Sequence, residues 1–447
     1  MNLQLFICLL FGLQLLYLWI GRRSSKHLKN KEDYYLAGKS VRLLPLTLTF
    51  LATQVGGGLV LGAAEEAYHF GWSVLFYPLG ASLGLIALGC GIGKKLSRFN
   101  VSTVAEIFEV VYRSPFLKKV ASLFSILSLF MILIAQIIAS HKFLVSVGLD
   151  NTALFVLFWM TVILYTTQGG LKAVISTDNA QAIFFSLIFL GCFGWTLFFQ
   201  PPLLDSLVTS SFTLIPSKFC GWLFMPLLFM LIEQDMGQRC FAGDSGKTVS
   251  RASLLAGVGT MLLCTIPVFF GVLAKHLNLS IPQGSSVLMA VIETVTTPWM
   301  AALVGCAILA AIISTATSLI SAISSNLVSD FTWPSFYKKR PLFFPKLLTG
   351  LISLAAILFA FYFNSIVDLL IQSYELSVSC LFAPLFMAFF RKKGRPLEAL
   401  LAILLGAFGF CFFRLYPLPF PKEILSVLLS FAGYFLARLR VSRSLEY

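Results

Sequence analysis

Long apolar stretches, separated by short polar segments, follow one another along the whole chain. Most are close to the roughly 20 residues that an α-helix needs to cross a bilayer, so we predict about 13 membrane-spanning helices. The ninth stretch is longer than one span needs, and we expect it to include a turn at one or both ends. The predicted spans are 3–20, 44–64, 72–93, 121–140, 152–167, 180–199, 220–238, 253–274, 286–327, 348–363, 366–390, 397–413 and 424–437.

The composition agrees with a chain that lies mostly in lipid. The 447 residues are 58% hydrophobic and only 12% charged, whereas soluble domains carry about 25% charged residues. No polar segment is long enough for a soluble domain. We therefore predict a single all-α, polytopic membrane domain over residues 1–447. Residues 1–43 would hold an extra helix and a basic loop, residues 44–390 the core, and residues 391–447 two further helices.

The net charge of +14 is explained by orientation in a membrane and requires no nucleic acid partner. When the loops are assigned alternately to the two sides, 28 of the 33 Lys and Arg residues fall on one side and 5 on the other. Because basic loops stay in the cytoplasm, the amino terminus is predicted outside and the carboxyl terminus inside. We expect a bacterial inner (plasma) membrane. The pattern indicates no oligomeric state.

Three consecutive glycines, Gly56, Gly57 and Gly58, interrupt the second apolar stretch. Backbone that leaves a helix inside lipid must find its hydrogen-bond partners within the protein. Transporters use such unwound backbone near the bilayer midplane to hold ions and polar solutes. The triplet therefore predicts a break in the helix at this point. Close packing of helices through small residues is the alternative explanation.

A second group of helix-breaking residues lies in the span 220–238, which contains Pro226 and the polar sequence Glu233-Gln234-Asp235. If the extra first helix is set aside, this span is the sixth of the core, and the glycine triplet lies in the first. A repeat of five spans has an odd number of crossings, so its second copy must be inverted. This arrangement is typical of transporters whose two halves move about a midplane site.

The strongest candidate for an ion site is the sequence Ala311-Ile312-Ile313-Ser314-Thr315. Residues at positions i, i+3 and i+4 share one helix face, so Ala311, Ser314 and Thr315 point the same way. Two hydroxyls and a few carbonyls form a neutral oxygen cage that suits a monovalent cation, because calcium or magnesium would require carboxylates. Alternatively, the hydroxyls bond only to carbonyls one turn earlier in their own helix.

Four segments, in order, resemble the sodium:solute symporter family. Together the resemblance covers about residues 32–390. The segments are residues 52–58 followed by Gly62 and Tyr68; residues 169–174 with Thr177, Asp178 and Gln181; residues 234–236 with Gln238 and Arg239; and residues 309–311 with Ser314 and Thr315.

The resemblance implies the LeuT-like fold, a five-plus-five inverted repeat, here with one extra amino-terminal and two extra carboxyl-terminal helices. It also implies sodium-coupled uptake of a small polar solute by alternating access. The sodium ion would be bound by the side chains of Ser314 and Thr315 and by the carbonyls of Ala52, Val55 and Ala311. Asp178 matches a family carboxylate that would relay the ion toward the cytoplasm. Alternatively, Asp178 caps the amino terminus of the next helix.

Candidate solute-binding residues are the glycine triplet and polar groups that lipid exposure would make costly. Gln54 stands where relatives often carry an aromatic residue or an acid. Glu375 could bind an amine, pair with an internal Arg or Lys, or lie at the membrane interface. The complete set is Gln54, Gly56, Gly57, Gly58, Gln136, Gln234, Tyr374 and Glu375.

We therefore expect a secondary active transporter that lies in a lipid bilayer and carries sodium as the co-transported ion. An intramembrane enzyme is disfavoured, because the four histidines lie in or near the loops and the sequence contains no HExxH pattern. Proton-coupled symport on the same fold and a passive channel remain as alternatives. The solute could be an amino acid, a vitamin, a sugar or a choline-like cation.

Overall fold

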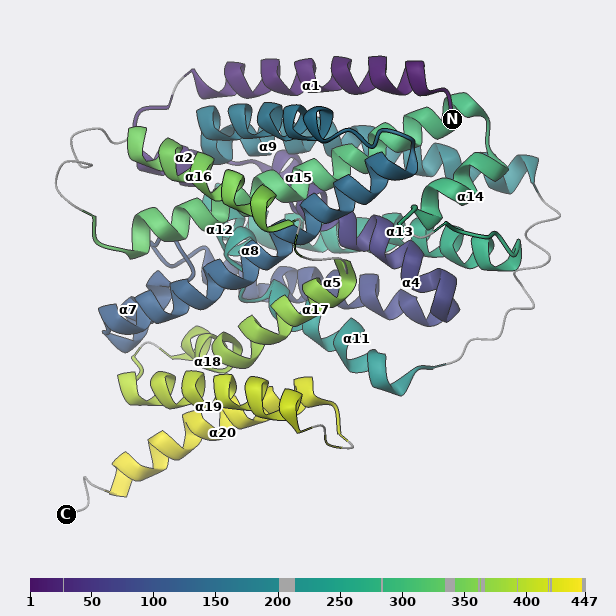
Figure 1. Ribbon diagram of the computed structural model, residues 1–447. Coiled ribbons are helices and arrows are strands. Elements are labelled where there is room, and N and C mark those ends of the chain that lie inside the picture. Colours follow the sequence, from purple (N-terminus) through teal and green to yellow (C-terminus); the bar gives the residue numbers. More distant parts are fainter. Residues whose placement is uncertain are drawn as a thin grey trace.

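The computed structural model describes residues 1–443 except 27, 201–213, 283, 334–341, 361, 363–365, 392, 417 and 419. Its elements are helices, which lie side by side in a bundle (Figure 1). They are α1 Leu3–Ser25, α2 Lys31–Leu36, η1 Ala37–Lys39, α3 Leu43–Gln54, η2 Gly58–Gly62, α4 Ala63–Phe70, η3 Gly71–Leu75, α5 Phe76–Ala87, η4 Leu88–Ile92, α6 Gly93–Leu96, α7 Glu106–Tyr112, α8 Pro115–Ser146, α9 Thr152–Phe199, α11 Pro216–Met230, α12 Gln234–Ala242, α13 Gly246–His276, α14 Val287–Val295, α15 Pro298–Asp330, α16 Phe343–Ala360, α17 Ile366–Ser377, η6 Val378–Phe382, α18 Ala383–Phe390, α19 Pro396–Leu415 and α20 Lys422–Arg443.

Within the described residues, ten helical segments are long and apolar enough to cross a membrane. This number is smaller than the predicted 13, partly because α9 covers two predicted spans without an intervening loop. The first core span is also divided, since α3 alone is too short to count. The predicted end of the span 348–363 lies outside the described residues.

The overlong ninth stretch resolves into two helices. The short helix α14 ends at Val295, Thr296 has an extended backbone, and α15 begins at Pro298. The Thr297 side chain accepts a hydrogen bond from the Met300 N–H, which caps the new helix. The expectation of a turn within this stretch is thus confirmed at its amino-terminal end.

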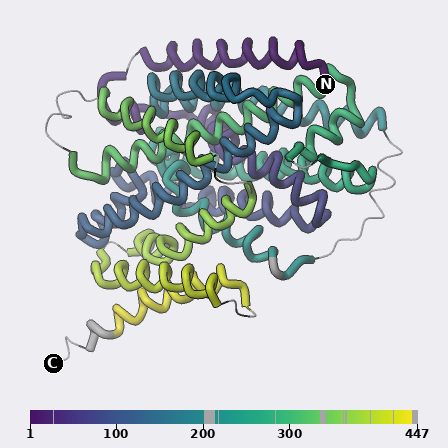
Figure 2. Tube along the Cα trace, viewed as in Figure 1, coloured from purple at the N-terminus to yellow at the C-terminus, as the bar shows by residue number. Residues whose placement is uncertain are grey.

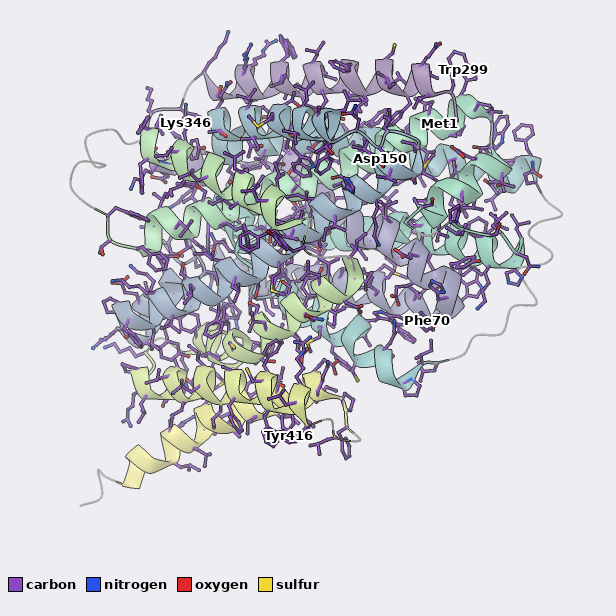
Figure 3. All side chains as sticks on the ribbon, viewed as in Figure 1. Met1, Phe70, Asp150, Trp299, Lys346 and Tyr416 are labelled. Carbon is purple, nitrogen blue, oxygen red and sulfur yellow. The ribbon has the colours of Figure 1, made fainter. Side chains whose placement is uncertain are left out.

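Helix α15 is the centre of the bundle. Of its most apolar stretch, 94% is buried inside the protein, against 17% for α1. It contacts α8, α9 and α3, whereas α1 lies along the outside against α9. Figure 2 shows the amino terminus and the end of α20 at opposite ends of the bundle. Lys346 likewise lies at the end opposite to Met1 and Trp299 (Figure 3).

Both predicted helix breaks are present. The first falls after Gln54, where Val55 leaves helical geometry (φ −78°, ψ 76°) before η2 begins at Gly58. The second separates α11 from α12, with Glu233 in an extended conformation (φ −67°, ψ 136°). Pro226 lies inside α11, so the polar residues and not the proline mark this break.

Helix α9 is sharply bent at Gly170, which has φ 52° and ψ −151°. The predicted spans 152–167 and 180–199 leave residues 168–179 outside both helices, but in the structure the chain returns to helix directly after this glycine. A Cβ atom at Gly170 would lie 2.3 Å from the Tyr34 carbonyl oxygen. Backbone conformation and close approach therefore both require glycine here.

We predict that Gly170→Ala destabilises the protein by about 1–3 kcal/mol, because a positive φ is strained for alanine. A lower melting temperature of the purified protein would show the effect. Gly191→Ala in the same helix is the matched control, since nothing lies within 4 Å of its added Cβ. Equal melting temperatures for the two variants would contradict the strain argument.

Candidate functional site

The break after α3 frees two backbone carbonyls. In a continuous helix the N–H groups of Gly56 and Gly57 would donate to the carbonyls of Ala52 and Thr53. Instead, Gly56 donates to Gln54 O (2.9 Å), and Gly57 donates to the Gln136 Oε1 atom of α8 (2.7 Å). The carbonyls of Ala52 and Thr53 must therefore find other partners.

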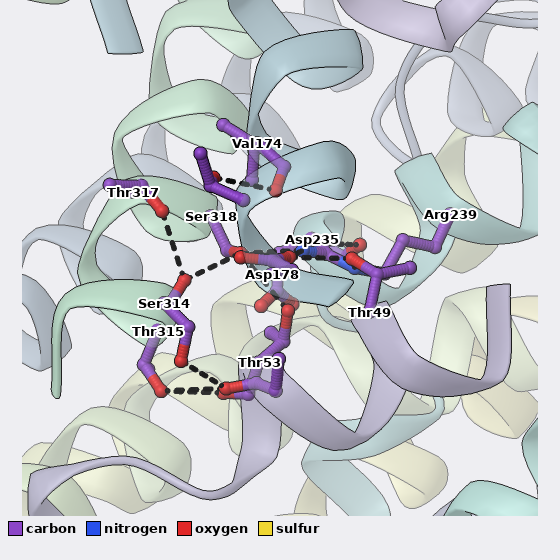
Figure 4. A network of polar contacts seen from close by, with 12 residues as sticks. Thr49, Thr53, Val174, Asp178, Asp235, Arg239, Ser314, Thr315, Thr317 and Ser318 are labelled. Atoms are coloured by element: carbon purple, nitrogen blue, oxygen red, sulfur yellow. Dashed lines mark hydrogen bonds and ion pairs between the residues drawn. The ribbon is translucent and has the colours of Figure 1, made fainter. Parts of the chain in front are cut away.

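Two hydroxyl groups of α15 lie within hydrogen-bond distance of these carbonyls. Ser314 Oγ lies 2.8 Å from Ala52 O and 2.8 Å from Ala311 O. Thr315 Oγ1 lies 2.9 Å from Thr53 O and 3.4 Å from Ala52 O. Figure 4 shows both side chains facing Thr53. The structure thus brings Ala52, Ala311, Ser314 and Thr315 together.

The oxygens of this group are uncharged and buried, and oxygen ligands without a carboxylate suit a monovalent cation better than a divalent one. Thr53, which the sequence did not indicate, supplies the carbonyl nearest to Thr315, and Val55 lies at the start of the break. Back-bonding within α15 is also present, since both hydroxyls approach Ala311 O. The two hydroxyls therefore lie close to carbonyls of their own helix and of α3.

Asp178 lies next to this oxygen group in a buried polar network (Figure 4). Its Oδ2 atom accepts a hydrogen bond from Thr49 Oγ1 (2.6 Å) and forms an ion pair with Arg239 Nη2 (3.1 Å). Ser318 links the network to Thr53, with 3.0 Å between the two hydroxyl oxygens. Asp178 lies inside α9, so the alternative that it caps the amino terminus of a helix is wrong.

A cavity lies beside the oxygen group, with about 410 Å³ of space not filled by atoms, open solvent included. Five predicted solute-binding residues line it: Gln54, Gly56, Gly58, Gln136 and Tyr374. Thr315 lines the same cavity, so one hydroxyl touches both the oxygen group and the cavity. Gly57 is held in contact with Gln136 through its N–H group.

The structure places two predicted solute-binding residues elsewhere. Gln234 Oε1 accepts the Val104 N–H (2.7 Å), so this side chain holds the segment before α7. Glu375 is 1% exposed, and its Oε2 atom lies 4.0 Å from Lys422 Nζ of α20. Neither lines the cavity, because each side chain points to a different neighbouring segment. The partner of Glu375 is thus an exposed lysine at the start of α20 and not an internal cation, since the Lys422 side chain is 39% exposed.

Several residues that line the cavity were not predicted from the sequence. Glu233 and Asp235 line it from the second break, and Tyr77 lines it from α5. Glu233 and Asp235 flank Gln234 in the polar sequence that predicted the break, so the signal was present. Tyr77 had no such signal, because one tyrosine in an apolar stretch is commonplace.

Comparison with known proteins identifies the chain's relatives. The sequence profile of the Sodium:solute symporter family matches residues 34–198 and 203–406. The chain is 26% identical over 321 residues to the sodium/pantothenate symporter of Haemophilus influenzae, covering 67% of this chain and 65% of that protein. It is 26% identical over 330 residues to the high-affinity choline transporter 1 of Drosophila melanogaster, covering 69% and 53%. The chain thus spans about half to two thirds of the length of these two relatives.

Two solved structures share the fold. One is a Na+-coupled sialic acid symporter in a substrate-bound, outward-open state; its TM-score is 0.80 with 18% identity over 97% of each chain. The other is a nucleobase-cation-symport-1 family transporter in a closed conformation; its TM-score is 0.64 with 14% identity, covering 93% of this chain and 96% of that one. The resemblance noted in the sequence is confirmed: the chain belongs to the sodium:solute symporter family, a transporter family with the LeuT-like fold.

Proposed function

We propose that the protein is a secondary active transporter that couples sodium to the uptake of a small polar organic solute by alternating access. The observation that carries this proposal is the meeting of two freed carbonyls of α3 with two hydroxyls of α15. Membership of the sodium:solute symporter family supports it, as do the likenesses to the sodium/pantothenate symporter and to the Na+-coupled sialic acid symporter.

Sodium would bind as cargo to the hydroxyls of Ser314 and Thr315 and to the carbonyls of Ala52, Val55 and Ala311. Thr53 O is a further candidate ligand, given its short contact with Thr315. Because these ligands belong to α3 and α15, the ion would hold the two helices together. It would thereby order the break that forms one wall of the solute cavity.

The energetics of such coupling suffice for accumulation. One positive charge crossing 100 mV yields about 2.3 kcal/mol. Since about 1.4 kcal/mol corresponds to a tenfold ratio, the membrane potential alone would support roughly 50-fold accumulation of a neutral solute. The solute would bind among Gln54, Gly56, Gly58, Gln136 and Tyr374, with Gly57 behind them.

We also propose the full topology predicted from the sequence, with 13 spans, the amino terminus outside and the carboxyl terminus in the cytoplasm of a bacterium. The opposite positions of the amino terminus and the end of α20 in the bundle support it. The concentration of basic residues on one side agrees, because basic loops remain cytoplasmic.

Asp178 would relay the departing ion. The network that joins Thr53, Ser318 and Asp178 begins beside the oxygen group and supports this role. Arg239 holds the carboxylate in place through its ion pair. Both side chains are fully buried, so each depends on the other for charge compensation.

We predict that Ser314→Ala combined with Thr315→Ala raises the sodium concentration needed for half-maximal thermal stabilisation and uptake by at least about tenfold, or 1.4 kcal/mol. The control is Ser321→Ala, a buried hydroxyl of the same helix that has no hydrogen-bond partner among the described residues. An unchanged sodium dependence in the double variant would reject the site. Uptake driven by a pH gradient and indifferent to sodium would instead favour proton coupling.

We further predict that Asp178→Asn and Arg239→Gln each destabilise the protein by about 3–5 kcal/mol, because each leaves a buried charge unpaired. The double variant should lose less than the sum of the two, and a double-mutant cycle of melting temperatures measures the difference. Lys39→Gln, which breaks an exposed pair with Glu32, should change stability by less than about 1 kcal/mol. Strict additivity at Asp178 and Arg239 would refute the pairing.

A further inference from the structure

The cavity has an acidic wall with free hydrogen-bonding capacity. Glu233 and Asp235 line it and are 5% and 1% exposed. The Glu233 Oε2 and Asp235 Oδ1 atoms have no hydrogen-bond partner within the described chain. The two carboxyl groups also interact with each other. The residues that line the cavity include no Lys, Arg or His.

The nearest arginine is engaged elsewhere. Arg239 Nη2 pairs with Asp178, Nε donates to Thr49 Oγ1 (3.0 Å), and Nη1 donates to the backbone carbonyl of Asp235 (3.0 Å). Its charge acts on Glu233 and Asp235 through space, but in the described chain it forms its ion pair with Asp178.

The acidic pair has no cation of its own within the described chain. Arg239 is paired with Asp178, and the lining of the cavity contains no other basic side chain. Buried polar groups require hydrogen-bond partners, so the free oxygens of Glu233 and Asp235 suit a ligand that brings N–H donors and a positive charge.

The remaining lining fits such a ligand. Tyr77 and Tyr374 line the cavity, and the Tyr374 ring packs on Phe229 with 4.7 Å between centroids. Aromatic faces attract ammonium groups.

We propose that the transported solute is a small organic molecule with a positively charged nitrogen, which binds at Glu233 and Asp235 beside Tyr77 and Tyr374. This inference rests on the proposed symport function, whose solute it specifies.

The test compares choline with 3,3-dimethylbutan-1-ol, an uncharged molecule of the same shape, by thermal stabilisation of the purified full-length protein in sodium. Choline should bind at least about tenfold more tightly, which corresponds to 1.4 kcal/mol. Ethanolamine distinguishes a primary from a quaternary nitrogen, and glycine betaine distinguishes a zwitterion from a net cation. This comparison needs no variant and so does not depend on how a variant folds.

Two variants test whether the cation binds at the acidic pair. Glu233→Gln and Asp235→Asn should each weaken binding of the preferred cation by about tenfold or more, or 1.4 kcal/mol. Glu398→Gln is the matched control, because this buried acid pairs with Arg391 outside the cavity. The stabilisation by sodium alone, measured on every variant, shows whether the ion site is intact.

Equal binding of the uncharged molecule, preference for the anion pantothenate, or no binding of any of the charged probes would overturn the proposal. In that case the symport proposal can still stand. It does so if sodium stabilises the wild type but not the variant that lacks the hydroxyls of both Ser314 and Thr315. If the charged probes bind as expected but their uptake ignores sodium, symport fails and the solute class stands.

Discussion

The structure depends on one constraint: a backbone carbonyl released from a helix inside a membrane must be satisfied by another part of the protein. The break after Gln54 releases the carbonyls of Ala52 and Thr53, and the hydroxyls of Ser314 and Thr315 approach both. The break is therefore stable only while α3 and α15 lie together. An ion that replaces these hydrogen bonds would act on the helix contact and the cavity at once.

The glycines serve this contact by lacking a side chain. None of Gly56, Gly57 and Gly58 has a positive φ. A Cβ atom at Gly56 would lie 2.4 Å from Thr315 Oγ1, and one at Gly57 would lie 2.6 Å from Ala139 Cβ. Unwinding and close packing, posed as alternatives for the triplet, are thus two parts of one arrangement. The break can meet its partners only because nothing stands between them.

The fold and the chemistry of the cavity carry different kinds of information. The same fold occurs in a Na+-coupled sialic acid symporter and in a nucleobase-cation-symport-1 family transporter, so it specifies no solute. Solute choice follows from the side chains that line the cavity. Here the acidic pair Glu233 and Asp235 faces two tyrosines, whereas the arginine of the region is paired with Asp178.

The sequence by itself determined the membrane class, the family and the two helix breaks, because hydrophobic length, glycine and buried polar residues act locally along the chain. It also indicated Ala311, Ser314 and Thr315 as one group, since helical spacing fixes which residues share a face. Only the tertiary structure decided what each polar side chain meets. Gln234 and Glu375 were plausible cavity residues, yet they bind the segment before α7 and Lys422. Glu233 and Asp235 reach the cavity because the break turns them toward it, and such a direction is set by the packing of distant helices.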